Sequence, residues 1–253
     1  MGPKAINSKF NWARHHFELY HLALAQYLQV NPCKFVPKPN VTTDNDGRRW
    51  VMGTFEAKEP LPEPLAQIIG DCLGNLRPTL DYLVWELVVA NGKKPERKHA
   101  FPIALTAASY ANEIQRGRLN DVDPGAIAFI EALQPYHAAN PDQALLAVLN
   151  EFTNINKHRR ILLTCLKTVM PMPDLHFVGE QAWGTVNPPP TQGNAEFGPF
   201  EVFGDEVKVQ ANVVAYVAFD EAPAQGFDVW SLLERISDYL NTIVFPKFGE
   251  FFA

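Results

Sequence analysis

The sequence has few cysteines, and their arrangement excludes a disulfide framework. Cys33, Cys72 and Cys165 are the three cysteines in 253 residues. They are far apart in the sequence, odd in number, and in no CxxC pair, which is the spacing typical of redox and zinc sites. We interpret them as small apolar residues in a reducing cytoplasm and expect no disulfide partner.

Long hydrophobic runs and an excess of positive charge are also missing. No apolar run approaches the roughly 18–20 residues that a membrane helix needs, and the segment 1–16 is too polar and mixed for a secretion signal. The net charge is −6, which argues against a general nucleic-acid coat, because phosphate binding needs a basic surface. We therefore expect a cytoplasmic protein with no membrane partner, and only a small local basic site is compatible with this charge.

Short motifs with a known mechanism are absent as well. The chain has no glycine-rich phosphate loop, no GxSxG elbow and no HExxH segment, which excludes the common sites that these motifs mark. His15, His16 and His21 are close in sequence, but none are four residues apart, the spacing that places two imidazoles on one metal from one helix. We expect neither a metal nor a cofactor.

Hydrophobic periodicity and turn residues predict mostly helix. The composition, 47% hydrophobic and 20% charged, is that of a chain that buries a core without metals or disulfides. Pro78 falls inside one expected helix, where it predicts a kink. The expected helices cover residues 9–29, 65–89, 106–116, 124–133, 141 to about 167, and 227–248.

The strand signals form two groups. Residues 49–56 have strand character, with 34–38 as hairpin partner, and residues 175–185, 196–203 and 207–219 form a later group with alternating polarity. This order predicts an α+β fold, in which a helical bundle with a long central helix lies beside an antiparallel sheet, with a C-terminal helix. We expect a single domain over 1–253, helix-rich over 1–170, with antiparallel strands in 175–222.

Two polar segments interrupt the two longest apolar helices. One is Glu151-Phe-Thr-Asn-Ile-Asn-Lys-His-Arg-Arg160, and the other is Asn75-Leu-Arg77. Polar groups in an apolar environment cost stability unless they pair. We therefore expect the two segments to meet in one cluster.

The residue types in this cluster allow two interpretations. Glu151, Asn154 and His158 share a helix face, and a histidine near a carboxylate and cations can transfer a proton near neutral pH. In the first interpretation the protein is an enzyme, and the cluster is its active site for a small anionic or RNA substrate. Its candidate catalytic residues are His158, Arg77, Tyr82 and Glu151, and its candidate substrate-binding residues are Asn75, Asn154, Lys157 and Arg159. In the second, the protein binds or assembles without catalysis, and the cluster is a structural network that includes an Arg77–Asp81 helix pair.

The C-terminus is rich in phenylalanine. Phe245, Phe248, Phe251 and Phe252 fall within eight residues. Such a group of apolar side chains either returns to the core or packs on another subunit. The second option predicts a homo-oligomer.

Four segments resemble a large family of uncharacterised bacterial proteins that are common in actinobacteria and environmental genomes. The segments are Gly70–Leu87, Phe101-Pro-Ile103, Glu131–Tyr136 and Leu149–Arg159, and the resemblance covers most of the chain. The family has no established activity, so the resemblance implies architecture rather than a function.

The polar segment Asn75-Leu-Arg77 and the residues after it are also similar to the signature of HEPN domains, helical bundles that include metal-independent ribonucleases. That signature is an arginine followed by four residues and a histidine. This chain keeps Asn75, Arg77 and Asp81, has Tyr82 at the histidine position, and carries Pro78 within the motif. The resemblance implies a hydrolase or ribonuclease, with His158 as the replacement imidazole if the two helices cross there.

Overall fold

The computed structural model has an α+β fold, as predicted. It describes residues 4–29, 33–57, 60–171, 196–203, 206–207 and 211–252. These form two compact units: a helical unit of Met1–Ala23, Glu63–Leu162 and Phe219–Ala253, and a β-rich unit of Leu24–Pro62 and Leu163–Ala218. The expectation of a single domain stays a prediction, and each unit is described by itself.

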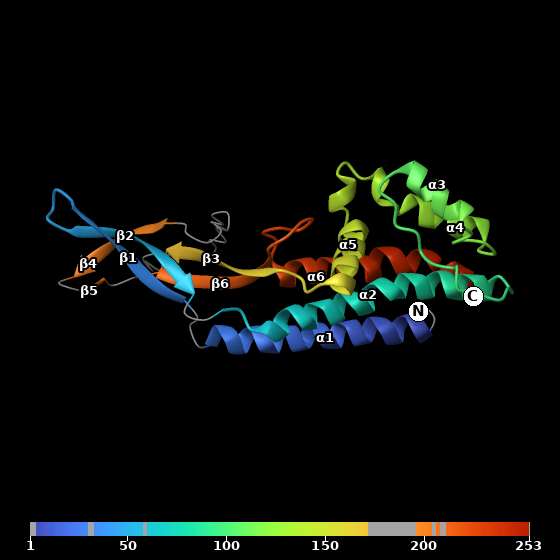
Figure 1. Cartoon of the computed structure of the whole chain (residues 1–253), viewed down its shortest axis with the longest axis horizontal. Helices are drawn as coiled ribbons and strands as arrows, with labels where there is room; N and C mark the ends of the chain where they lie inside the picture. Colours follow the sequence, from blue (N-terminus) through green and yellow to red (C-terminus); the bar gives the residue numbers. More distant parts are fainter. Residues whose placement is uncertain are drawn as a thin grey trace, which may run out of the picture. The chain divides into compact units, whose positions relative to one another are not determined.

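The helical unit contains most of the predicted helices (Figure 1). Their N-caps follow the expected chemistry: Thr106 and Ser109 form a capping box on α3, and Asp123 and Asp228 accept backbone N–H groups at the starts of α4 and α6. The elements are α1 (Lys4–Gln29, whose last residues belong to the β-rich unit), α2 (Glu63–Ala90), α3 (Ala107–Gln115), α4 (Pro124–Ala132), the 3₁₀ turns Pro135–His137 and Pro141–Gln143, α5 (Leu145–His158) and α6 (Val229–Asp238).

Helix α2 is the central helix of this unit. Its apolar side chains cover more than one face, so it is buried on several sides, as the sequence predicts. Pro78 lies within the continuous helix. The side chains that are at most 1% exposed include Leu65, Ile69, Cys72, Leu73, Leu76, Leu80, Leu83, Val84, Leu87 and Val88.

Helix α5 packs across α2 (Figure 1). Phe152 of α5 is fully buried and stacks on Phe219 with ring centroids 4.4 Å apart. The close approach depends on Gly70 of α2, because a Cβ atom there would collide with the side chain of Asn156. Gly70 thus faces Asn156 of α5, and Arg77, seven residues further along α2, bonds Asn150 of the same helix.

The β-rich unit contains a four-stranded antiparallel sheet of order β1-β2-β4-β5 and a two-stranded sheet of β3 and β6. The predicted hairpin of 34–38 with 49–56 is confirmed, with a longer first strand. In that strand the register shifts between Pro37 and Val41, and β1 lies at the edge of the described sheet, where proline is tolerated best. The strands are β1 (Cys33–Thr43), β2 (Arg49–Ala57), β3 (Leu163–Pro171), β4 (Glu196–Phe203), β5 (Glu206–Val207) and β6 (Ala211–Phe219).

Several predicted boundaries are wrong. The helix expected from 141 to about 167 begins at Leu145, after a 3₁₀ turn, and ends at His158; residues 163–171 form β3 instead. Short apolar runs fit either helix or strand, and here pairing with β6 decides for strand. Strands therefore begin well before residue 175, and the strand expected over 175–185 lies outside the described residues.

The C-terminal segment is helical but not one α-helix. After α6 the chain continues as π-helix over Tyr239–Val244 and as 3₁₀-helix over Phe245–Phe252. Phe248 is fully buried, and Phe251 contacts both Phe248 and Phe129 of α4. Phe245 meets Phe10 of α1 edge to face. Within the helical unit, these phenylalanines pack on their own chain, and the homo-oligomer stays a prediction.

Neither a membrane span nor a metal cluster is found in the described part of the chain. No helix there is long and apolar enough to cross a bilayer. No group of three or more His, Cys, Asp or Glu side chains is arranged to hold a metal ion.

Candidate functional site

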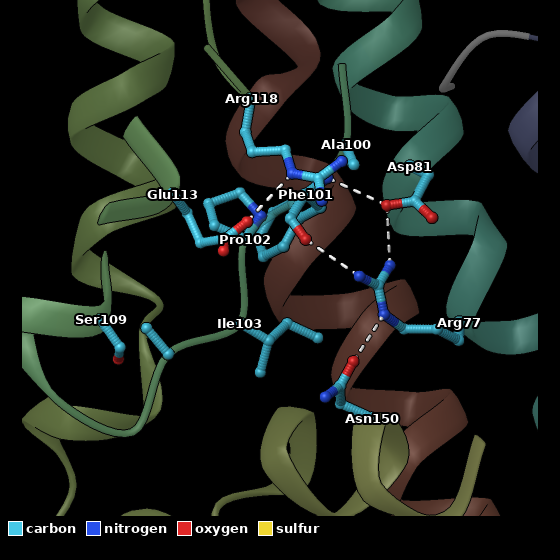
Figure 2. Close-up of a pocket in the computed structure, with 11 residues that line it drawn as sticks. Arg77, Asp81, Ala100, Phe101, Pro102, Ile103, Ser109, Glu113, Arg118 and Asn150 are labelled. Atoms are coloured by element: carbon cyan, nitrogen blue, oxygen red, sulfur yellow. Dashed lines mark hydrogen bonds and ion pairs between the residues drawn. The ribbon is translucent and has the colours of Figure 1, made fainter. Parts of the chain in front are cut away.

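Arg77 joins three elements of the helical unit. From α2 its Nη1 donates to Asp81 Oδ1 (2.8 Å), its Nε to Asn150 Oδ1 of α5 (3.2 Å), and its Nη2 to the carbonyl of Phe101 (3.0 Å) (Figure 2). Its side chain is 14% exposed. A guanidinium is suited to this position because its N–H donors point in fixed directions within one plane.

The segment 100–104 is fixed on two sides. Asp81 Oδ1 accepts the Phe101 N–H (3.0 Å) while Arg77 holds the carbonyl of the same residue. Gln134, which is 2% exposed, donates to the carbonyl of Pro102 and accepts the N–H of Ala104, both at 2.9 Å. The side-chain amide thus replaces the backbone partners that a buried loop would otherwise lack.

Arg118 reaches the same place from the end of α3. Gly117, at φ +75°, follows the C-cap of α3 and reverses the chain, a conformation that glycine adopts without a steric penalty. The Arg118 N–H then returns to the carbonyl of Glu113 (3.3 Å), and its Nε donates to Glu113 Oε2 (3.0 Å). Its Nη1 donates to the carbonyl of Lys98 (3.2 Å).

These groups surround a pocket of about 350 Å³. Figure 2 shows Arg77 arriving from α2, Asn150 from α5, and Arg118 with Glu113 opposite the 100–103 segment. The lining residues are Arg77, Asp81, Ala100, Phe101, Pro102, Ile103, Ala104, Ser109, Glu113, Arg118 and Asn150.

The carboxylates that line the pocket are paired with arginines. Asp81 binds Arg77, and Glu113 is shared by Arg118 and by Arg116, whose Nη1 lies 2.6 Å from Glu113 Oε1. The lining residues therefore carry two guanidinium groups, Arg77 and Arg118, and two carboxylates, while Arg116 binds Glu113 from outside the pocket. Arg118 Nη2 and Asn150 Nδ2 have no protein partner in the described part of the chain, so they remain as donors.

The structure brings only part of the predicted cluster together. Arg77 pairs with Asp81, as expected, but its partner on α5 is Asn150, one residue before the predicted segment. Asn75 points elsewhere: its Oδ1 accepts from Lys9 of α1 (3.1 Å), and its Nδ2 donates to the carbonyl of Asp71. Tyr82 is 38% exposed and does not line the pocket.

The remaining predicted residues of α5 lie away from Arg77. Lys157 and His158 are exposed in the last turn, about 12 Å along the axis from Asn150 at 1.5 Å per residue. Asn154 is half-buried, and Glu151 is exposed beside the pocket without lining it.

Arg159, just after α5, belongs to a separate contact. Its Nη2 donates to Glu221 Oε2 (2.5 Å), and this hydrogen bond raises the pKa of the arginine. Glu221 Oε1 also accepts the N–H of Leu162 (2.5 Å).

Sequence reasoning missed Arg118, Glu113 and Asn150. Arg118 and Glu113 lie on a short helix and its following turn, where charged residues are ordinary, so no sequence signal separates them from a solvated surface. Asn150 directly precedes the predicted polar segment, and Phe101 falls in one of the segments that carry the family resemblance. Including the residues next to the polar segment, and those of the family-resemblance segment, among the candidates would have identified Asn150 and Phe101.

Comparison of the chain with protein-family models, with curated proteins and with solved structures found no match. The bacterial family and the HEPN similarity inferred from the sequence therefore stay predictions.

Proposed function

We propose that this protein binds a small anionic ligand in the pocket between α2, α3, α5 and the 100–104 segment. The observation that carries the proposal is the pair of unused donors, Arg118 Nη2 and Asn150 Nδ2, lining a pocket of about 350 Å³. Arginine suits planar carboxylate and phosphate groups because its donors match their oxygens two at a time. Arg118 is the residue that contacts the anion, and Arg77 positions Asn150 and Phe101.

The polar groups of the pocket support binding better than catalysis. Ser109 Oγ donates to the Thr106 carbonyl as part of the α3 capping box, so it has no adjacent base to activate it. Asp81 and Glu113 are each paired with an arginine, so their oxygens are already engaged. Among the lining residues there is no histidine.

The hydrolase or ribonuclease suggested by the HEPN similarity remains a second hypothesis, and no contact in the described residues favours it. Its candidate base, His158, is exposed and does not line this pocket. Direct measurement of RNA cleavage by the wild-type chain addresses it.

The test of the binding proposal is isothermal titration calorimetry with inorganic phosphate and with acetate. We expect Arg118→Gln to weaken binding of whichever anion binds by tenfold or more, because a charge-assisted contact contributes about 1.5–3 kcal/mol. The matched control is Arg116→Gln, since Arg116 pairs with the same Glu113 but does not line the pocket.

Two results contradict the proposal. One is the absence of binding by both anions at millimolar concentration. The other is an equal loss of affinity in Arg116→Gln and Arg118→Gln, which indicates a nonspecific effect of charge.

A further inference from the structure

A second pocket of about 190 Å³ adjoins the anion pocket. Ile103 and Asn150 line both pockets, so the two share a wall. The second pocket is also lined by Leu105, Ala147 and Pro223, with Asp142 and Glu151 as its ionisable residues.

The walls of the two pockets differ in chemistry. The second pocket exposes mainly the apolar side chains of Ile103, Leu105, Ala147 and Pro223. Leu105 is 48% exposed to solvent, so a ligand that covers it removes apolar surface from water, which is favourable.

Asn150 stands where the two pockets meet. Its Oδ1 is fixed by Arg77 Nε, and this orients the Nδ2 donor away from Arg77. An anionic group that accepts a hydrogen bond from Asn150 Nδ2 therefore lies at the entrance to the apolar pocket. Whatever is attached to that group can extend past Ile103 into the second pocket.

The two carboxylates of the second pocket are unpaired. Asp142 and Glu151 are both exposed, and in the described part of the chain neither makes a hydrogen bond or an ion pair. A second negative charge on the ligand would face them directly, and like charges brought together across a binding site are unfavourable.

We propose that the two pockets together select a monoanion that carries a short apolar chain, with a carboxylate as the anionic group. This inference rests on the proposed anion site. The second pocket, of about 190 Å³, has room for a chain of a few carbons. Dianions of the same length, and polyanions such as RNA, are disfavoured because they place charge beside Asp142 and Glu151.

Calorimetric titration with straight-chain carboxylates tests the proposal. The series is acetate, butanoate and hexanoate, with hexanedioate as a dianion of the same length as hexanoate. We expect affinity to rise by up to about fourfold per added methylene, the value for full burial. We expect hexanedioate to bind at least tenfold more weakly than hexanoate.

Variants of the acidic residues test the selectivity separately. Glu151→Gln combined with Asp142→Asn should reduce the preference for hexanoate over hexanedioate by threefold or more. Both residues are exposed, so folding is not at risk, and melting temperature verifies this. The matched control is Glu234→Gln, an exposed glutamate of α6 that lines neither pocket, and it should leave the preference unchanged.

The outcomes separate the two proposals. If acetate or phosphate binds in an Arg118-dependent manner but chain length brings no gain, the two-pocket inference is overturned and the anion site stands. If hexanedioate binds as well as hexanoate, the selection of monoanions is overturned. If no member of the series binds, the anion site itself fails.

Discussion

At the scale of single residues, the described part of the helical unit leaves two buried tyrosine hydroxyls, those of Tyr20 and Tyr110, without a hydrogen-bond partner. Tyr110 of α3 is 8% exposed, and its hydroxyl has no hydrogen-bond partner in the described part of the chain. Burial, followed by the nearby Glu131 and Tyr136, raises the pKa of Tyr110 from 10.0 to about 12. The fold therefore favours the neutral phenol.

This predicts the behaviour of Tyr110→Phe as a function of pH. The pKa of Tyr110 is higher in the folded than in the unfolded protein. The folded state is therefore fully favoured by the neutral phenol below pH 10, and this contribution to stability is lost as the pH rises from about 10 to 12. Between pH 10 and 12 the unfolding free energy of Tyr110→Phe should therefore fall by about 1–2 kcal/mol less than that of the parent. At pH 7 its unfolding free energy should be equal to or higher than that of the parent, since no hydrogen bond is removed.

Urea denaturation at pH 7, 10 and 11.5 measures both effects. Tyr82→Phe is the control, because Tyr82 is 38% exposed. A marked loss of stability in Tyr110→Phe at pH 7 would show that the hydroxyl has a partner after all.

At the scale of elements, the contact between α2 and α5 depends on one of two nearby glycines in α2. A Cβ atom at Gly70 would meet the side chain of Asn156, whereas a Cβ atom at Gly74 would meet nothing within 4 Å. Both positions are in the helix interior, where alanine is preferred over glycine by about 1 kcal/mol. The two positions therefore separate helix propensity from packing.

We expect Gly74→Ala to raise the unfolding free energy by about 0.5–1 kcal/mol. Gly70→Ala should lower it by about 1 kcal/mol or more, because inserting atoms at a tight contact forces neighbours to move. Thermal and urea denaturation of both variants provide the measurement. Asn156→Ala added to Gly70→Ala should recover part of the loss, and equal stability of the two glycine variants would contradict the packing argument.

At the scale of the whole molecule, the chain leaves the helical unit after Leu162 and re-enters it at Phe219. Glu221, which is 9% exposed, holds these two places together by accepting the Leu162 N–H and the Arg159 guanidinium. The Asp220 N–H completes the contact by donating to the Leu162 carbonyl (2.9 Å). One carboxylate thus contacts the chain at two of its four crossings between the units.

Glu221→Ala should lower the unfolding free energy by about 2 kcal/mol, because it removes the acceptor of the Leu162 N–H and of the Arg159 guanidinium. Glu221→Gln keeps one acceptor oxygen and should cost about half as much. Chemical denaturation measures the loss, and limited proteolysis near residues 159–163 should become faster in the alanine variant. Unchanged stability in both variants would show that this carboxylate is dispensable.

Sequence patterns were sufficient where the information is local. The helix starts at Thr106, Asp123 and Asp228 follow from capping chemistry, and the apolar face of α2 follows from its periodicity. The α+β class follows from the order of these elements, and the Arg77–Asp81 pair follows from helix spacing alone.

The functional site could be predicted only in part, because its partners come from distant segments. Arg77 was identified as an unusual cation in an apolar helix, but its meeting with Asn150 rather than His158 depends on how α5 crosses α2 at Gly70. Arg118 enters the pocket only because Gly117 reverses the chain after α3.

The sequence by itself determined which segments are helical, where several of them begin, and that a polar residue such as Arg77 needs a partner within an apolar helix. The tertiary structure alone decided which partner it has, that α5 ends at His158 and β3 follows, and that two adjoining pockets form. The physical reason is that local patterns fix backbone conformation and the face of burial. The pairing of side chains from distant segments depends instead on crossing geometry, which single close contacts such as Gly70 with Asn156 determine.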